Sequence, residues 1–470
     1  MRTMSKQHAK SVVIAVIGGA GRYWCPVVMR DLALCGRLSG ELRLFDQRSS
    51  SVNAAFGEAL FRHADSQTNF RVTWTTNLRR ALRGADFVVI GISPGPASMF
   101  ANDLDIPLRY GVLQTVGDTT GPGGISRALR TVPLMTRFAE AVAEHCPKAW
   151  VVNYTNPMTL ATAALHAAAP GIKAFGSCHE VAAATRRLTA IADGYAGSVR
   201  PSGKPIHMDI AGVNHFTFAT AARRGATNLF TLVDRHIREP GRFADQTAYA
   251  RDNAARGAFW DHRGLISMDL YRRFGALGAA GDRHLAEFVP WYLADGEAGL
   301  HRWGVVVTPS SLRTGVWRPA PGVVPAPNPL APSSDVPERL TPSGEEGVAQ
   351  MCALAGAGDL VTNVNLPNAG QMPDLPPGAI VETNAMFQAD SVRAIAPKPL
   401  PEALSALVRR IVDVHRLTLQ AGRSRDFDTA LQAVLLDPLC RLSTDRAAAM
   451  LRELIQANRE LLPGWKAARP

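Results

Sequence analysis

The sequence predicts an α/β fold in which a Rossmann-type, doubly wound parallel sheet precedes a second, mixed α+β domain rich in helices. Three observations indicate this class. β-Branched strands alternate with helical segments through the first part of the chain, glycines separate the first strand from the first helix, and an aspartate ends the second strand. The alternation becomes irregular after about residue 200, so we expect domains over residues 1–200 and 201–470.

The first elements follow one another as strand, turn and helix. Ser11 to Ile17 is a β-branched run of the kind that a strand buried on both faces requires. Glycines follow at once between Gly18 and Gly21, and helical spacing of apolar residues extends from Trp24 to Leu38. A second strand, Leu42 to Phe45, ends on Asp46.

The same pattern continues down the chain. A proline-rich segment over 319–337 is expected to be a loop, and helical periodicity returns over 404–461. The other expected elements are a helix over 54–64, a strand over 86–91, a helix over 127–144, a strand over 149–153, a helix after Pro157 and a strand over 173–175.

The composition is that of a globular protein, since 46% of the 470 residues are apolar and 19% are charged. No apolar run approaches the roughly 20 residues that span a bilayer, and the first ten residues are polar and basic. The six cysteines form no CxxC pair, which favours a reducing cytoplasm over a disulfide framework. We therefore expect a soluble, cytoplasmic protein without membrane contact.

The net charge of +11 does not by itself identify a partner. It comes from 51 Lys and Arg against 40 Asp and Glu, and the arginines are scattered rather than gathered in one block. No basic motif interleaved with aromatic residues accompanies them, so we expect no nucleic-acid binding.

The glycine turn predicts a nucleotide site. Gly18, Gly19 and Gly21 would let the backbone approach a pyrophosphate at the N-terminus of the following helix. Asp46 stands where a carboxylate can accept hydrogen bonds from the adenosine ribose, which favours NAD over its 2′-phosphorylated relative. A turn that binds no nucleotide is the alternative, and Asp46 makes it the weaker one.

Two further clusters indicate a ligand site. The segment from Gly117 to Gly124 contains Asp118 together with several glycines and a proline, which suggests a backbone shaped around a ligand. The segment from Asn153 to Pro157 follows a strand at the edge where open α/β sheets bind ligands. Cys178 and His215 could hold a divalent cation, although, taken alone, a buried cysteine and a core histidine are the better explanation of them.

Taken in order, these motifs resemble glycoside hydrolase family 4, whose members depend on NAD and manganese. The resemblance extends from about residue 12 to residue 385, and the family is an exception to the two-carboxylate scheme of most glycosidases. The matching motifs are Val16–Gly21, Gly117–Gly124 with Arg127–Thr131, Asn153–Pro157, Cys178–Val181, Asn214–His215 and Asn365–Gly370.

The resemblance implies hydrolysis by oxidation and elimination. NAD takes a hydride from C3 of the sugar, which makes the C2 proton acidic, and a divalent metal, usually manganese, stabilises the enediolate formed when a base removes that proton. The aglycone then leaves C1, water adds, and the hydride returns.

The resemblance also implies roles for individual residues. Cys178 and His215 would be the metal ligands, while Asn156 and His179 would contact the sugar. Glu180 would be the acid for the leaving oxygen or a supporting residue behind the site.

Two acids complete this set. Asp118 would orient the substrate or handle a proton, and Asp282 would be the C2 base, in place of the tyrosine of the phospho-sugar branch. A surface turn with an exposed acid is the alternative for Asp282.

The residues from Cys178 to Val181 resemble branches that act on unphosphorylated sugars, so an α-glucoside or α-galactoside is the expected substrate. Arg283, or a residue from the arginine-rich region 302–337, could bind a carboxylate, which keeps an α-uronide open. A 2-hydroxy acid dehydrogenase of the lactate/malate type and a non-catalytic nucleotide sensor would share the nucleotide fold and stay open as functions of a different class. By the same resemblance we expect a homodimer or homotetramer acting on a small-molecule glycoside.

Overall fold

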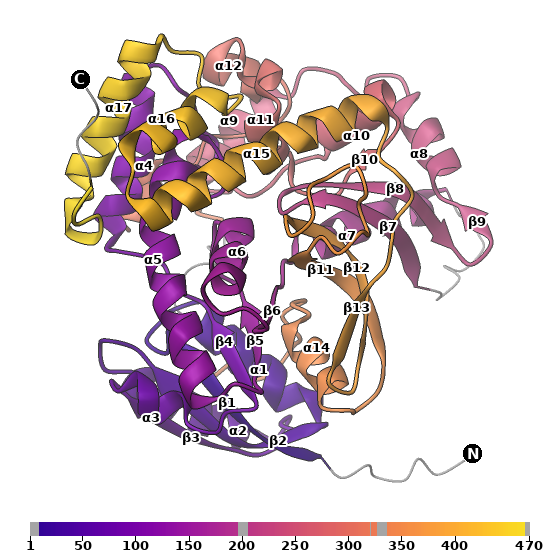
Figure 1. Ribbon diagram of the computed structural model, residues 1–470. Coiled ribbons are helices and arrows are strands. Elements are labelled where there is room, and N and C mark those ends of the chain that lie inside the picture. The colour runs from indigo at the N-terminus through magenta and orange to yellow at the C-terminus, as the bar shows by residue number, and fades with distance from the viewer. Residues whose placement is uncertain (1–8, 196–204, 320, 327–335, 466–470) are drawn as a thin grey trace.

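A computed structural model describes residues 9–195, 205–319, 321–326 and 336–465 (Figure 1). Much of the predicted proline-rich loop, and most of the first ten residues, lie outside this part of the chain. None of the helices in the described ranges is both long and apolar enough to cross a membrane. All six cysteines fall within these ranges, and each is a free thiol.

The N-terminal half is built on a parallel sheet, which confirms the predicted fold class. Its strand order, β3-β2-β1-β4-β5-β6, is that of a Rossmann fold. The strands are β1 (Lys10–Ile17), β2 (Leu38–Phe45), β3 (Phe70–Thr75), β4 (Phe87–Ile90), β5 (Trp150–Asn153) and β6 (Lys173–Gly176).

Strands from beyond residue 200 extend this sheet. β11 (Leu360–Pro367) pairs antiparallel with β6, and β12 (Ile380–Gln388) and β13 (Ser391–Ala394) continue outward, so the sheet has nine strands. Figure 1 shows these orange strands beside the end of the magenta β6. The expected division at residue 200 therefore separates segments that share one sheet.

A second, smaller sheet belongs to the C-terminal half. β7 (Ile206–Val213) and β8 (Phe216–Arg224) form an antiparallel hairpin, and β9 (Thr227–Asn228) and β10 (Leu277–Gly278) pair with β8. The Asn384 side chain donates a hydrogen bond to the Met208 carbonyl at 2.6 Å, which ties the two sheets together.

Helices cover both faces of the large sheet and form most of the C-terminal half. Those of the N-terminal half are α1 (Trp24–Cys35), α2 (Ser51–Phe61), α3 (Leu78–Leu82), α4 (Ala97–Arg109), α5 (Gly121–His145), α6 (Met158–Ala168) and α7 (Glu180–Gly194). The later ones are α8 (Phe230–Ile237), α9 (Thr247–Arg256), α10 (Leu265–Phe274), α11 (Asp282–Phe288), α12 (Gly296–His301), α13 (Ser310–Arg313), α14 (Gly347–Leu354), α15 (Glu402–Ser424), α16 (Phe427–Leu436) and α17 (Thr444–Ala457).

The predicted elements are observed with shifted ends. α1 ends at Cys35 rather than at residue 38, because Gly36 takes a left-handed conformation with φ of 61°. Sequence reasoning missed β3 and α4. β3 is an edge strand in which apolar and polar residues alternate, so it lacks the continuous β-branched run that marked β1.

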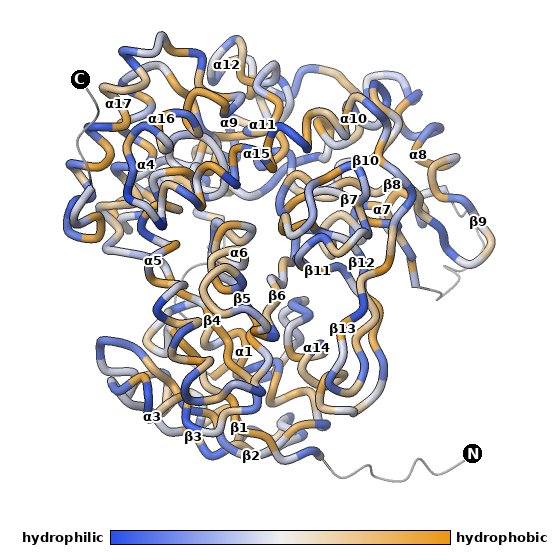
Figure 2. The backbone as a smooth tube through the Cα atoms, viewed as in Figure 1, coloured by the Kyte–Doolittle hydropathy of each residue, from blue (hydrophilic) through white to orange (hydrophobic). Residues whose placement is uncertain are grey.

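The long helix α15 shows how the C-terminal half builds its core. Its residues alternate between orange and blue in Figure 2, as expected of a helix with one buried face. Leu404, Val408 and Ile411 form part of that face and pack into the main apolar cluster of this half.

His415 on the buried face of α15 predicts an acid sensitivity. Burial lowers its pKa to about 4, so the folded protein binds this proton less readily than the unfolded chain, whose histidine has a pKa of 6.5. Stability should therefore fall as the pH drops from 6.5 toward 4, by about 2 kcal/mol between pH 7 and pH 5 from this residue alone.

Urea unfolding of wild type and His415→Leu at the two pH values tests this expectation. The variant should lose about 2 kcal/mol less on acidification than the wild type. An equal loss in both proteins would rule out His415 as the source.

Candidate active site

The glycine turn after β1 is tightly packed against neighbouring backbone. The amides of Gly18 and Gly19 both donate to the Phe45 carbonyl, at 3.0 and 2.8 Å. Gly18 has a φ of 99°, and a Cβ there would lie 2.4 Å from the Gly91 carbonyl oxygen, so only glycine fits. The turn leads into α1, which is the arrangement that receives a pyrophosphate.

Asp46 lies beside this turn, as the nucleotide prediction requires. One carboxylate oxygen accepts the Ala20 amide at 3.3 Å and the other accepts the Arg48 amide at 3.1 Å. Asn53 donates to the carbonyls of Gly19 and Gly21 at 2.7 and 2.8 Å and holds the turn from its other side.

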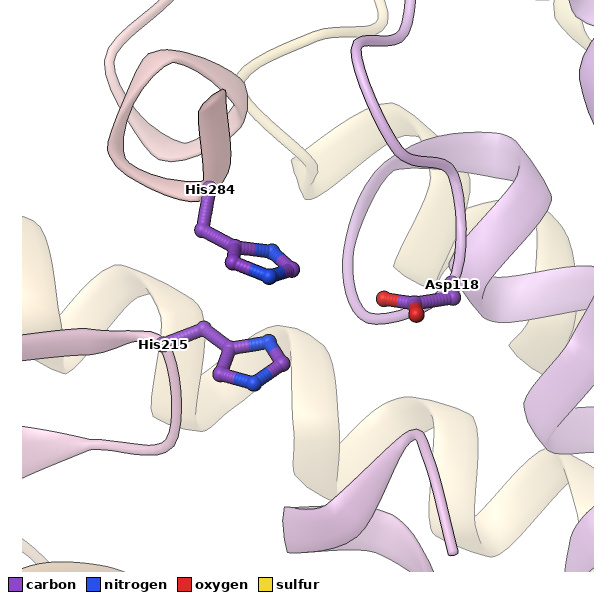
Figure 3. Close-up of side chains that lie close together, drawn as sticks. All are labelled: Asp118, His215 and His284. Atoms are coloured by element: carbon purple, nitrogen blue, oxygen red, sulfur yellow. The ribbon is translucent and has the colours of Figure 1, made fainter. Parts of the chain in front are cut away.

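A three-residue cluster forms where the two halves of the chain meet. Asp118, His215 and His284 each offer one ligand atom, and these atoms lie within 4.8 Å of one another. Figure 3 shows the two imidazole rings facing each other with the carboxylate directed toward them. The ring centroids are 3.8 Å apart and the rings are stacked.

Each member of the cluster comes from a different kind of segment. His215 occupies the two-residue turn of the β7–β8 hairpin with a φ of 65°, a conformation that only few residue types adopt readily. Asp118 precedes α5, in the glycine-rich segment that the sequence singled out. His284 lies in the first turn of α11.

Thr119 links two members of the cluster and determines the imidazole tautomer. Its hydroxyl donates to the Asp118 carboxylate at 2.7 Å, and the same oxygen lies 2.8 Å from His215 Nδ1. Because a hydroxyl has a single hydrogen, the second contact requires an N–H on His215 Nδ1. The lone pair of His215 Nε2 is therefore free to bind a cation.

The electrostatics of the cluster suit a divalent cation. Burial lowers the pKa of both His215 and His284, which leaves neutral imidazoles near pH 7. Burial alone would raise the pKa of Asp118, whereas the Arg313 guanidinium and the hydrogen bond from Thr119 act to lower it. Arg313 keeps its charge when the imidazoles are neutral. One carboxylate and two imidazoles form a donor set that fits manganese and similar ions.

Cys178 lies next to this cluster but is not one of its three members. Its side chain is buried. Burial raises the pKa of the thiol. The assignment of Cys178 as a metal ligand stays a prediction.

His179 and Glu180 border the cluster. His179 Nδ1 lies 3.0 Å from a carboxylate oxygen of Glu345, and Glu180 lies 3.8 Å from His284 Nε2. Burial would raise the pKa of Glu180, and positive charge on His179 would lower it. Its assignment as the acid for the leaving oxygen, or as a supporting residue behind the site, stays a prediction.

Asp282 is fully buried at the start of α11, so the exposed-turn alternative does not apply to it. Its carboxylate accepts the Ser267 amide at 3.0 Å and lies 3.3 Å from His262 Nδ1. Burial would raise its pKa, but His262 and Arg187 lower it. It is therefore a carboxylate, as a base must be, and its role as C2 base stays a prediction.

The predicted substrate residue Asn156 meets Asp118 in the structure. Its amide nitrogen lies 3.5 Å from an Asp118 carboxylate oxygen, and its carbonyl accepts a bond from Arg127 Nε at 3.0 Å. Residues that are separate in the sequence are thus brought to one place.

Three arginines surround Asp118, and each interacts electrostatically with that carboxylate: Arg127, Arg283 and Arg313. Within the described ranges, Arg127 Nη1, Arg283 Nη1 and Arg313 Nε are buried nitrogens without a hydrogen-bond partner. The guanidinium carbons of Arg127 and Arg313 lie 4.6 and 4.5 Å from the ring centroid of Phe100. Packing against an aromatic ring holds a guanidinium group in place and leaves its positive charge unpaired.

The sequence of the chain matches models of one enzyme family over both halves. Residues 13–193 match the family 4 glycosyl hydrolase model, and residues 210–440 match the model of its C-terminal domain. The chain belongs to family 4 of the glycosyl hydrolases. The predicted family and the prediction of a glycosidase are confirmed.

This family 4 glycosidase is similar to its relatives along almost its whole length. It is 39% identical to an alpha-galacturonidase from Thermoanaerobacterium saccharolyticum, with 99% of each chain covered. The crystal structure of lplD from Bacillus subtilis has a TM-score of 0.78 at 31% identity, covering 95% of this chain and 100% of that one.

A more distant solved structure shares the fold. It is a 6-phospho-alpha-glucosidase from gut microorganisms in complex with NAD and Mn²⁺, with a TM-score of 0.72 at 20% identity and coverage of 97% of this chain and 100% of that one.

Sequence reasoning missed several residues of this candidate site. His284 was part of the motif around Asp282 but was not identified as a possible ligand, and Arg313 lay in a region that matched no motif. A buried acid on α11, Glu287, was also missed, and burial raises its pKa to about 8. The helical spacing of residues 283, 284 and 287, which places them on one side of a short helix, was the available signal.

Proposed function

We propose that this family 4 glycosidase hydrolyses α-galacturonides, with NAD and a divalent cation such as Mn²⁺ as cofactors. The observation that carries this proposal is the set of buried guanidinium nitrogens without partners around Asp118. The name of the relative at 39% identity supports the same sugar.

Charge favours an anionic substrate over a neutral one. Arg127, Arg283 and Arg313 bring three positive charges to the surroundings of Asp118. A buried donor without a partner costs free energy, and a carboxylate can accept from two guanidinium nitrogens at once. A uronide carboxylate would supply those acceptors, whereas the neutral C6 hydroxyl of a hexoside could not form charge-assisted hydrogen bonds from both partners.

The glycoside expected from the Cys178–Val181 motif was an α-glucoside or α-galactoside. The unphosphorylated sugar is retained in the proposal, but the uronide alternative now has the stronger support. Arg283 was the residue on which that alternative rested, and Arg313 joins it from the region that matched no motif.

The protein's own residues would prepare the sugar for reaction. When bound, NAD supplies reversible oxidation at C3, and the divalent cation stabilises negative charge on the sugar oxygens. Asp118 and the two imidazoles would hold the cation, and Asn156 would orient hydroxyls. Asp282, ionised and buried, is the proposed acceptor of the C2 proton.

A panel of nitrophenyl glycosides tests this proposal. Purified protein with NAD, Mn²⁺ and a thiol reductant should release nitrophenol from the α-galacturonide at least about 100-fold faster, in kcat/KM, than from the α-galactoside, as expected when two charge-assisted hydrogen bonds are at stake. The α-glucuronide and 6-phospho-α-glucoside serve as comparisons.

The panel also distinguishes a glycosidase from a dehydrogenase and from a nucleotide sensor. Accumulation of NADH absorbance with 2-hydroxy acids would indicate a dehydrogenase, and nucleotide binding without any nitrophenol release would indicate a sensor. Equal rates on galactoside and galacturonide would reject the role given to the arginines.

A further inference from the structure

Arg313, one of the arginines proposed to receive a substrate carboxylate, lies on an element that has little packing of its own. α13 is a helix of four residues, and none of its side chains is fully buried. A single helical turn is not stable without contacts from outside. The position of Arg313 therefore depends on how the chain is anchored on either side of α13.

The two flanks of α13 are anchored differently. Before the helix, the Thr308 amide donates to the Thr115 carbonyl at 3.0 Å, which ties the chain to the segment that leads into the site. After the helix the chain folds back, and the Trp317 amide donates to the Ser311 carbonyl at 2.9 Å. The place of this second flank depends on what the Trp317 side chain packs against.

The Trp317 ring packs against the end of α9. A Cβ on Gly257, the residue after α9, would lie 2.5 Å from Trp317 Cη2, so the ring leaves no room for a side chain there. The ring of Phe259 meets it edge to face, with centroids 5.5 Å apart. Trp317 thereby joins a small apolar cluster, separate from the larger ones, whose buried members are Ala250, Phe259 and Val306.

We propose that Trp317 is a positioning residue for substrate specificity, which fixes the turn after α13 and so holds the Arg313 guanidinium where a uronide carboxylate would bind. This inference rests on the proposed function, because it assumes that Arg313 binds that carboxylate. The effect of Trp317 on the substrate passes through Arg313, four residues earlier in the chain.

The same small cluster also contacts a second arginine of the site. Trp260 packs against the cluster, and its ring centroid lies 5.4 Å from the guanidinium carbon of Arg283. Among the described residues, Arg283 Nη1 and Arg313 Nε are buried without a hydrogen-bond partner. Aromatic contacts can hold a guanidinium group while leaving its N–H groups for a ligand. The cluster is thus placed to align both groups for one carboxylate.

Two substitutions of Trp317 test this role. Trp317→Ala removes the ring and leaves Arg313 in the chain, whereas Trp317→Phe keeps a smaller aromatic ring. We expect Trp317→Ala to raise the KM for nitrophenyl α-galacturonide by about 10-fold, near the lower end of what a hydrogen bond to a charged group contributes. The kcat should stay within about 3-fold, because the weakened contact would bind substrate and transition state alike. Trp317→Phe should raise the KM less.

The neutral sugar separates specificity from a general defect. Hydrolysis of the α-galactoside should change by no more than about 3-fold in both variants, because it has no carboxylate for Arg313 to bind.

Limited proteolysis follows the anchoring itself, without any glycoside. Trypsin cleaves after arginine, and mass spectrometry of the digested full-length protein gives the rate of cleavage after Arg313. This rate should rise by at least about 5-fold in Trp317→Ala, because a segment that opens more readily is cleaved faster.

Trp150→Ala is the matched control. Trp150 is half-buried, its ring centroid lies 6.1 Å from that of Phe175, and it begins β5 at the end of the strand opposite to Asn153. Its loss should change neither the KM for the galacturonide nor the cleavage after Arg313.

Each outcome decides the inference. An unchanged KM for the galacturonide or unchanged cleavage after Arg313 in Trp317→Ala would overturn it. An equal loss on the galactoside, or an equal effect of Trp150→Ala, would also overturn it, because either would indicate a general disturbance of the fold. A wild type without preference for the galacturonide would overturn it together with the proposed substrate. If Arg313→Met lowers galacturonide hydrolysis but Trp317→Ala does not, only the role of Trp317 fails.

Discussion

His215→Asn should abolish glycosidase activity and raise the Kd for Mn²⁺ by at least about 100-fold, since losing even an outer partner of a metal site costs 10- to 100-fold. His215 is the residue on which the sequence motif and the observed cluster agree. Asparagine tolerates the φ of 65° at this turn better than alanine does, so the hairpin should survive while the imidazole is lost. Titration of Mn²⁺ and the nitrophenyl assay measure the two effects.

Three companion variants locate the other donors. His284→Ala should weaken Mn²⁺ binding if the observed cluster holds the cation, and Cys178→Ser should weaken it if the predicted thiolate does. His301→Asn, on α12 and paired with Glu297, is the control and should bind Mn²⁺ normally. Normal Mn²⁺ affinity in His215→Asn would refute both donor sets.

Arg313→Met should lower kcat/KM for an α-galacturonide by about 10- to 100-fold, which corresponds to the 1.5–3 kcal/mol of a hydrogen bond to a charged group. Methionine can still pack on the ring of Phe100, so the loss should reflect the missing charge rather than a cavity. Hydrolysis of the neutral α-galactoside should change by no more than about 3-fold, because that sugar brings no carboxylate for the guanidinium to bind.

The exposed arginine five residues further along provides a matched control. Arg318 bonds only to the nearby carbonyls of Gly315 and Trp317 among the described residues. Arg318→Met should leave both substrates unaffected. A parallel loss of galactoside and galacturonide hydrolysis in Arg313→Met would mean that Arg313 supports the fold of the site and does not select the carboxylate.

The fold could be predicted where a segment has a clear pattern of apolar residues and glycines. The β-branched run ending at Ile17 and the glycines after it specify a buried parallel strand and a turn, and both are observed. The antiparallel strands β11 to β13 could not be assigned to the same sheet, because their place depends on the long-range pairing of Asn365 with Gly176.

The site was predictable as far as its motifs extend. Asp118, Asn156 and His215 were identified separately, and the structure brings them together. His284 and Arg313 could not be placed beside them. A single sequence does not show that α11 and α13 both pack toward the segment before α5, nor that burial leaves their polar atoms without partners.

The central claim is that the site binds a divalent cation and a uronide carboxylate together. A crystal structure of the protein with Mn²⁺ and galacturonate, with an anomalous difference map that locates manganese, tests it most directly. We predict one manganese peak in contact with His215 Nε2, with the sugar carboxylate on Arg283 and Arg313. A peak remote from His215, or a carboxylate that contacts neither arginine, would contradict the account.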